Sequence, residues 1–167
     1  IQLELEFKSN LEQLDEKIAI REQMIKASLQ LLDYIDNPSQ RNNDSIIKYI
    51  THTINSPTFD PILNDLISSG KLQLLQNNRL KQLLSFWTSE IIQVTEDENA
   101  WRKLAADVYF PFLKAHINYR NVLANYWKTN QVNAVLIDKN QKTELNLTPS
   151  KYIEDISKLL DITDFED

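Results

Sequence analysis

Apolar residues at the start of the chain recur in steps of four and three, the spacing of one face of an α-helix. This first stripe consists of Phe7, Leu11, Leu14, Ile18, Ile25, Leu32 and Ile35, with polar residues Arg21 and Ser28 at the two intervening positions of the register. We expect one long helix from Ile1 to Ile35 that packs in a bundle along this stripe. Asn37 and Pro38 predict its end, because the residue before a proline is disfavoured in the α conformation.

Two shorter helices are predicted after the first helix. One begins at Asp44 or Ser45 as its N-cap, ends before Ser56, and carries the apolar residues Ile46, Ile47, Ile50 and Ile54. The other begins with Asp60 as its cap and Pro61 in its first turn, and buries Ile62, Leu63, Leu66 and Ile67. We predict that Gly70 ends this helix as a left-handed C-terminal cap, since it is a lone glycine followed by an apolar residue.

A second long helix is predicted to begin with Asn77 as its cap. Its apolar stripe runs through Leu80, Leu84, Trp87, Ile91, Val94, Glu98, Trp101, Ala105 and Val108, and continues in the same register through Phe112, Ala115, Tyr119, Val122 and Tyr126. Pro111 lies inside this pattern, where it removes one backbone hydrogen bond and crowds the carbonyl four residues earlier. Either a kink or a restarted helix is expected at Pro111, and the unbroken register favours the kink.

The helical periodicity disappears between Thr129 and Leu147, so we expect a small hairpin or an ordered loop near residues 133–147. A last helix is predicted from Thr148 and Pro149, with Ile153, Ile156, Leu159 and Leu160 on one face. The single glycine of the chain also favours helices over sheets joined by tight turns. The predicted fold is all-α: one helical bundle domain over residues 1–167, with two long helices and several short ones.

Composition excludes several kinds of chemistry. The 18 basic and 24 acidic residues give a net charge of -6, so we expect no nucleic-acid partner. The absence of cysteine excludes thiol catalysis and thiolate metal sites, and one glycine cannot supply a phosphate-binding loop. Neither His52 nor His116 has an acidic residue three positions before it, as a di-metal bundle site would need. No catalytic, cofactor-binding or metal-binding residue and no cofactor are therefore predicted.

Four residues are predicted to have structural roles: Arg21, Glu98, Gly70 and Pro111. Arg21 and Glu98 are charges of opposite sign at stripe positions of the two long helices. Antiparallel packing would bring them within about one turn of each other as an interior ion pair; the alternative is that each side chain reaches solvent at the edge of its stripe. Trp87 and Trp101 are interpreted as core residues, with a ligand site as the alternative.

From Thr58 to Trp87 the chain resembles an uncharacterised family of bacterial proteins, chiefly from Bacteroidota. The matching features are Phe59, the Leu66 to Leu72 stretch around Gly70, and Leu75, Asn77 and Leu80 ahead of Trp87. Members of this family have one transmembrane helix followed by a helical extracytoplasmic domain of unknown function. The first helix, with its LEQLDEKI stretch, fits the same layout.

The resemblance implies a membrane helix upstream of Ile1 and a domain that faces the periplasm, of which this chain would be the trimmed part outside the membrane. Together with the absence of catalytic motifs, it favours a non-catalytic structural or protein-interaction domain with a protein partner. The alternative is an extracytoplasmic bundle that senses a ligand bound between its helices. A second membrane helix and a signalling module after Asp167 would favour sensing.

Overall fold

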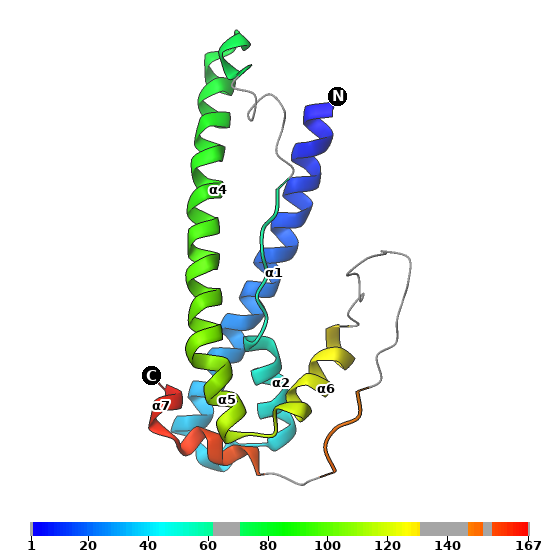
Figure 1. Cartoon of the computed structure of the whole chain (residues 1–167), viewed down its shortest axis with the longest axis vertical. Helices are drawn as coiled ribbons and strands as arrows, with labels where there is room; N and C mark the ends of the chain where they lie inside the picture. Colours follow the sequence, from blue (N-terminus) through cyan, green and yellow to red (C-terminus); the bar gives the residue numbers. More distant parts are fainter. Residues whose placement is uncertain (1, 62–70, 131–146, 152–154, 167) are drawn as a thin grey trace. The chain divides into compact units, whose positions relative to one another are not determined.

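The computed structural model describes residues 2–61, 71–130, 147–151 and 155–166, and this part of the chain is helical and contains no strand. The predicted all-α class is therefore confirmed, with two long helical segments and several short ones (Figure 1). No helix within the described ranges combines the length and the apolar character that a membrane span requires. Gly70, the third predicted helix from Ile62 onward and nearly all of residues 133–147 lie outside these ranges.

The first helix, α1, spans Gln2–Asp36 and ends before Asn37 and Pro38 as predicted, with the short 3₁₀ helix η1 at Pro38–Gln40. Its predicted apolar stripe is wrong at every second position. The exposed residues include Leu11, Ile18, Ile25 and Leu32, whereas Asn10, Ala27, Leu31 and Tyr34 are buried. Each of these buried residues lies one position before a residue of the predicted register, so the spacing is the same and the buried face is rotated about the helix axis. Spacing of three and four residues predicts that a helix has an apolar face, but it does not decide between two neighbouring faces.

Helix α2 spans Asn43–Thr53 and begins slightly earlier than predicted. The side chain of Asn42, rather than Asp44 or Ser45, is the N-cap, and its Oδ1 accepts a hydrogen bond from the Ser45 amide at 3.0 Å. The second long helix, α4, spans Asn78–Leu104 after the short 3₁₀ helix η2 at Lys71–Leu74. Its predicted cap is confirmed, because the Asn77 Oδ1 accepts from the Leu80 amide at 3.0 Å.

Pro111 neither breaks the helix nor leaves its register unchanged. A π-helical turn, η3 (Ala105–Tyr109), joins α4 to α5 (Phe110–His116), and the joined helix is 39 residues long (Figure 1). A π turn holds an extra residue and shifts the following side chains around the helix. Leu113 is therefore completely buried.

Beyond Ala105 the predicted stripe is wrong at Val108 and Ala115, which are exposed. It is confirmed at Val122, which is buried, and at Phe112 and Tyr119, which pack against the core. The helix ends at His116, not at Pro111, because Ile117 adopts an extended conformation (φ -136°, ψ 160°). A separate helix, α6, then spans Tyr119–Asn130. The helix is thus interrupted at Ile117 and Asn118, inside the predicted continuous register through Tyr126, and the apolar pattern does not reveal this interruption.

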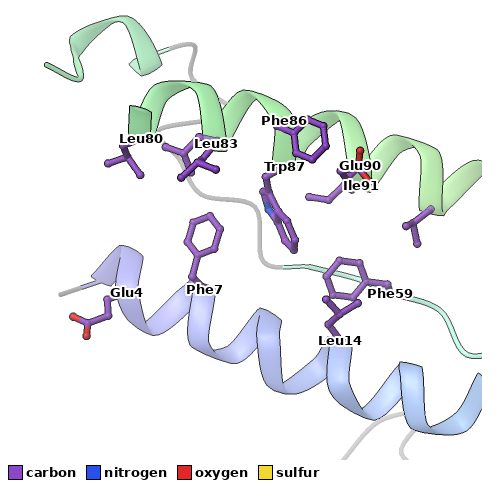
Figure 2. Close-up of a pocket in the computed structure, with 12 residues that line it drawn as sticks. Glu4, Phe7, Leu14, Phe59, Leu80, Leu83, Phe86, Trp87, Glu90 and Ile91 are labelled. Carbon is purple, nitrogen blue, oxygen red and sulfur yellow. The ribbon is translucent and has the colours of Figure 1, made fainter. Parts of the chain in front are cut away.

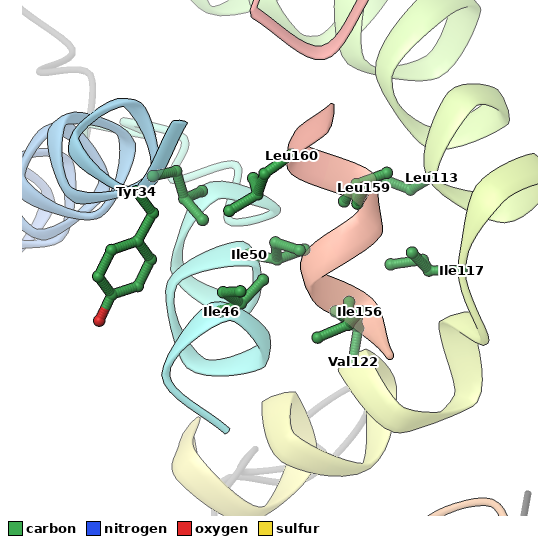
Figure 3. Close-up of a cluster of buried hydrophobic side chains, with 10 residues drawn as sticks. Tyr34, Ile46, Ile50, Leu113, Ile117, Val122, Ile156, Leu159 and Leu160 are labelled. Atoms are coloured by element: carbon green, nitrogen blue, oxygen red, sulfur yellow. The ribbon is translucent and has the colours of Figure 1, made fainter. Parts of the chain in front are cut away.

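Residue contacts divide the chain into two compact units: unit 1 comprises Ile1–Arg21 and Ser56–Leu104, and unit 2 comprises Glu22–Asn55 and Ala105–Asp167. The core of unit 2 is a hydrophobic cluster of Leu31, Tyr34, Ile46, Ile50, Leu113, Ile117, Val122, Ile156, Leu159 and Leu160 (Figure 3). Arg41 donates a hydrogen bond to the Asp161 carboxylate at 2.5 Å beside this cluster.

The last predicted helix begins later in the structure than the expected start at Thr148 and Pro149. Thr148 and Pro149 are not helical; the 3₁₀ helix η4 spans Ile156–Asp161, with Asp155 as its N-cap, and α7 follows at Thr163–Glu166. The Asp155 carboxylate accepts a hydrogen bond from the Ser157 hydroxyl at 2.7 Å, and this hydrogen bond lowers the pKa of Asp155. The predicted burial of Ile156, Leu159 and Leu160 is confirmed.

Candidate functional site

The charged pair predicted from the sequence forms in unit 1, but the antiparallel packing that was expected to bring the two residues together is wrong. Phe7 meets Trp87 and Arg21 meets Glu98 further along both helices, so α1 and α4 run parallel (Figure 2). The Nη2 of Arg21 in α1 donates to the Oε1 of Glu98 in α4. The Glu98 side chain is only 9% exposed, whereas that of Arg21 is 35% exposed. The carboxylate is therefore the buried member of the pair, and the guanidinium reaches it from a partly solvated position.

A backbone amide is the third member of this arrangement, and the sequence did not indicate it. The Phe59 N–H donates to both carboxylate oxygens of Glu98, at 3.0 and 3.2 Å. Hydrogen bonds to an ionised acceptor are roughly twice as strong as those between neutral groups. Glu98 thus holds one positive side chain and one main-chain donor at the same carboxylate.

The non-helical segment at residues 57–60 is attached to α1 at two further points. The Gln13 side chain pairs with the main chain of Asp60, donating to its carbonyl at 3.0 Å and accepting from its amide at 2.7 Å. The Arg21 guanidinium also donates to the Pro57 carbonyl at 3.4 Å. Side chains of α1 and α4 therefore satisfy backbone groups that a helix or sheet would otherwise pair.

This attachment places the Phe59 ring inside unit 1. Phe59 is buried and meets the Trp87 ring edge-on, with centroids 5.9 Å apart and an angle of 81° between the ring planes. Phe7 of α1 contacts the same indole, with centroids 5.7 Å apart. Aromatic pairs in such geometries contribute about 0.5–1.5 kcal/mol beyond their area burial. The polar contacts of Glu98 and Gln13 thus position one ring of a three-ring cluster.

The aromatic cluster forms part of the wall of an apolar groove of about 730 Å³ (Figure 2). We call this site the groove. It is lined by Glu4, Phe7 and Leu14 of α1, by Phe59, and by Leu80, Leu83, Leu84, Phe86, Trp87, Glu90, Ile91 and Val94 of α4. Leu83 and Phe86 are 48% and 64% exposed, so the groove opens to solvent along α4.

Two carboxylates are the charged groups among the described residues that line the groove. Glu4 comes from α1 and Glu90 from α4, and both side chains are exposed. Neither carboxylate forms an ion pair with another residue that the structure describes. The groove therefore offers apolar side chains, aromatic faces and two carboxylates that have no ion-pair partner in the described ranges, an arrangement suited to holding a ligand with an apolar surface.

The two histidines and the residues with a shifted pKa belong to unit 2 and do not line the groove. Burial, followed by the positive charge of Lys48, lowers the pKa of His52. The Nδ1 of His116 lies 2.8 Å from the Phe112 carbonyl oxygen. Burial raises the pKa of Tyr109 to about 12, and its hydroxyl lies 2.5 Å from that of Thr53. Within the described ranges, no three histidine or acidic side chains gather as a metal-binding group.

The four residues singled out from the sequence have different outcomes. Arg21 and Glu98 come together in unit 1, Pro111 lies in α5 of unit 2, and Gly70 lies outside the described residues. Trp87 was interpreted as a core residue, but it also lines the groove. The sequence contained one signal of the groove: Leu83 and Phe86 are large apolar residues that lie outside the predicted stripe.

Comparison with protein-family models, with curated proteins and with solved structures gave no match to this chain.

Proposed function

We propose that this chain is a non-catalytic helical domain that binds a protein partner through the groove of unit 1. The observation that carries the proposal is the combination of an open apolar groove with exposed Leu83 and Phe86 at its edge. Large apolar side chains that gather at an open surface are typical of interaction sites. The polar contacts of Glu98 support this role, since they fix the Phe59 ring in the wall before any partner arrives.

The proposal places this domain in a membrane-anchored protein, on the periplasmic side. Residues 58–87 resemble the uncharacterised bacterial family described above. This resemblance supports the location, because members of that family carry a membrane helix ahead of a helical domain. The upstream reading frame tests it. A segment of about 20 predominantly apolar residues shortly before Ile1 is expected, and its absence would contradict the anchor.

A small apolar ligand is the second candidate for the groove. Its volume of about 730 Å³ supports this alternative, because pockets for small molecules usually measure about 300–1,000 Å³ and have mainly apolar walls. A small ligand in the groove agrees with a ligand-sensing bundle. This candidate differs from the protein partner in one measurable respect, since a small ligand would leave the outward Phe86 side chain in water.

The test compares two substitutions of exposed apolar residues on α4. Leu83→Glu places a charge in the lining of the groove, whereas Ile92→Glu changes another exposed apolar residue of α4, which does not line it. An amphipathic helical peptide with leucine on one face and glutamine on the other is the probe. We expect Leu83→Glu to weaken binding at least about tenfold, because burial of one leucine contributes about 1.5–3 kcal/mol. Ile92→Glu should bind as the unmodified chain does.

Equal loss of peptide binding in both variants would contradict the assignment of the groove. Absence of peptide binding to the unmodified chain, together with binding of an apolar dye that Leu83→Glu abolishes, would favour the small-molecule alternative. Circular dichroism of both variants provides the control, since the two side chains are exposed and should be replaced with little change in folding.

A further inference from the structure

The apolar surface of unit 1 extends outward from the groove. Leu83 and Phe86 are one turn apart on α4 and are about half and two thirds exposed. A small molecule that fills the space near Trp87 would cover little of the outer Phe86 side chain. A longer apolar surface that lies against α4 would cover both residues and fill the groove, so the exposed edge favours a macromolecular occupant.

The length of the groove matches the apolar face of a helix. Its lining on α4 extends from Leu80 to Val94, a distance of about 21 Å at 1.5 Å per residue. Anchors at positions i, i+3 or i+4, i+7 and i+11 of a bound helix span about 17 Å by the same rise. Helices that bind in grooves are recognised by such a row of anchors. Three to four turns of a partner helix therefore fit the lined stretch.

Charge determines which partner fits. Glu4 and Glu90 line the groove from opposite helices, are exposed, and have no ion-pair partner among the described residues. A second copy of the chain would bring the same carboxylates and a net charge of -6 to the interface. Like charges at an interface disfavour association, whereas opposite charges increase both the rate and the specificity of binding.

We propose that the groove binds an amphipathic helix of a partner protein in which lysine or arginine residues flank the apolar anchors. Leucine-sized side chains of the partner helix pack against the apolar lining beside Phe7, Phe59 and Trp87, and its basic residues face Glu4 and Glu90. This inference rests on the proposed function and adds the chemical class of the partner.

The experiment uses three synthetic peptides of about 18 residues, or five helical turns. All three have leucine at the same positions, and their polar faces carry lysine, glutamine or glutamate. Fluorescence anisotropy of labelled peptide measures each affinity for the full chain at low and high salt. We expect the lysine peptide to bind about three- to tenfold more tightly than the glutamine peptide at low salt, and the glutamate peptide to bind most weakly. High salt should reduce the difference.

Matched variants locate the charge effect. Glu4→Gln/Glu90→Gln should remove the preference for the lysine peptide without changing the affinity for the glutamine peptide. Glu12→Gln/Glu96→Gln removes two exposed carboxylates from the same helices outside the lining, and should keep most of the preference. An equal effect of the two double variants would show that net charge, and not the groove, selects the peptide, and would overturn the inference.

The outcomes separate this inference from the proposed function. Equal affinity for all three peptides, lost in Leu83→Glu, would overturn the basic partner while leaving the interaction domain in place. Absence of binding by every peptide would overturn both. Concentration-dependent dimers in sedimentation, abolished by Leu83→Glu and not by Ile92→Glu, would identify a second copy as the occupant and would also overturn the inference.

Discussion

Replacing Arg21 by methionine tests the charged pair that attaches residues 57–60 to the two long helices. The substitution retains an unbranched side chain and leaves Glu98 buried, with the Phe59 amide as its remaining hydrogen-bond partner among the described residues. Breaking a fully buried ion pair costs about 3–5 kcal/mol, and breaking an exposed pair costs about 0–1 kcal/mol. Arg21 is 35% exposed, so we expect a loss of about 2–3 kcal/mol in the free energy of unfolding.

Two double variants separate the ion pair from the hydrogen bond to the main chain. In Arg21→Met/Glu98→Leu no charge is buried, but the Phe59 N–H loses its acceptor, which costs about 1–3 kcal/mol. In Arg21→Met/Glu98→Gln the amide oxygen still accepts from Phe59. We therefore expect the glutamine variant to be more stable than Arg21→Met, and also more stable than the leucine variant.

Urea unfolding followed by far-ultraviolet circular dichroism measures these differences. Arg79→Met is the control, because it removes an exposed arginine of α4 and should change stability by less than about 0.5 kcal/mol. Two results would refute the reasoning: an Arg21→Met variant as stable as this control, or a leucine double variant at least as stable as the glutamine one. The first result would show that the Arg21–Glu98 pair contributes little to the free energy of unfolding. The second would show that the Phe59 N–H needs no acceptor.

Three further predictions address other parts of the chain. Burial raises the pKa of Tyr109 to about 12 from 10.0, so its contribution to stability is present below pH 10 and is lost as the pH rises toward 12. Urea midpoints measured across this range should fall for the unmodified chain, and Tyr109→Phe should reduce that fall. Gly70→Ala should cost about 1 kcal/mol if the sequence-based assignment of a left-handed cap is correct, and an unchanged melting midpoint would contradict it. Phe59→Ala should lower stability by about 3 kcal/mol and shift the Trp87 emission to longer wavelength as the indole gains solvent; unchanged emission would argue against the ring contact.

The sequence was sufficient for the helical class, the end of α1 and the cap of α4. These features depend on local chemistry: Pro38 disfavours the α conformation just before it, and the Asn77 side chain reaches the amide of Leu80. The Arg21–Glu98 pair was also predictable, because two opposite charges interrupted two otherwise regular stripes. The direction of packing was not, since α1 and α4 run parallel and not antiparallel as expected. Local pattern and charge thus carried the predictions that succeeded.

The rotation of each helix about its axis was not predictable from apolar spacing. On α1, Asn10 is buried and Leu11 exposed, although spacing alone favours the leucine. Beyond Ala105 the π turn shifts the register, so Val108 turns outward. The buried face of α1 depends on tertiary contacts, and the shifted register depends on the π turn before Pro111. A repeat of three or four residues specifies neither of these two features.

The groove was missed for a related reason. Its wall depends on Phe59, whose ring is placed by long-range hydrogen bonds from Glu98 and Gln13 rather than by a helix or strand. Such a wall has no periodic signature in the sequence. The exposed pair Leu83 and Phe86 was visible, but exposure could be assigned only once the face of α4 that packs against the rest of unit 1 was known.

Methyl chemical shifts recorded during a titration with the leucine–lysine peptide test the central claim most directly. The account predicts saturable shifts at Leu80, Leu83, Leu84 and Ile91, which line the groove, and no comparable shifts at Ile46 and Ile50 in the core of unit 2. Shifts centred on Ile92, which is exposed on α4 outside the lining, or shifts absent from the groove methyls at saturation, would contradict it.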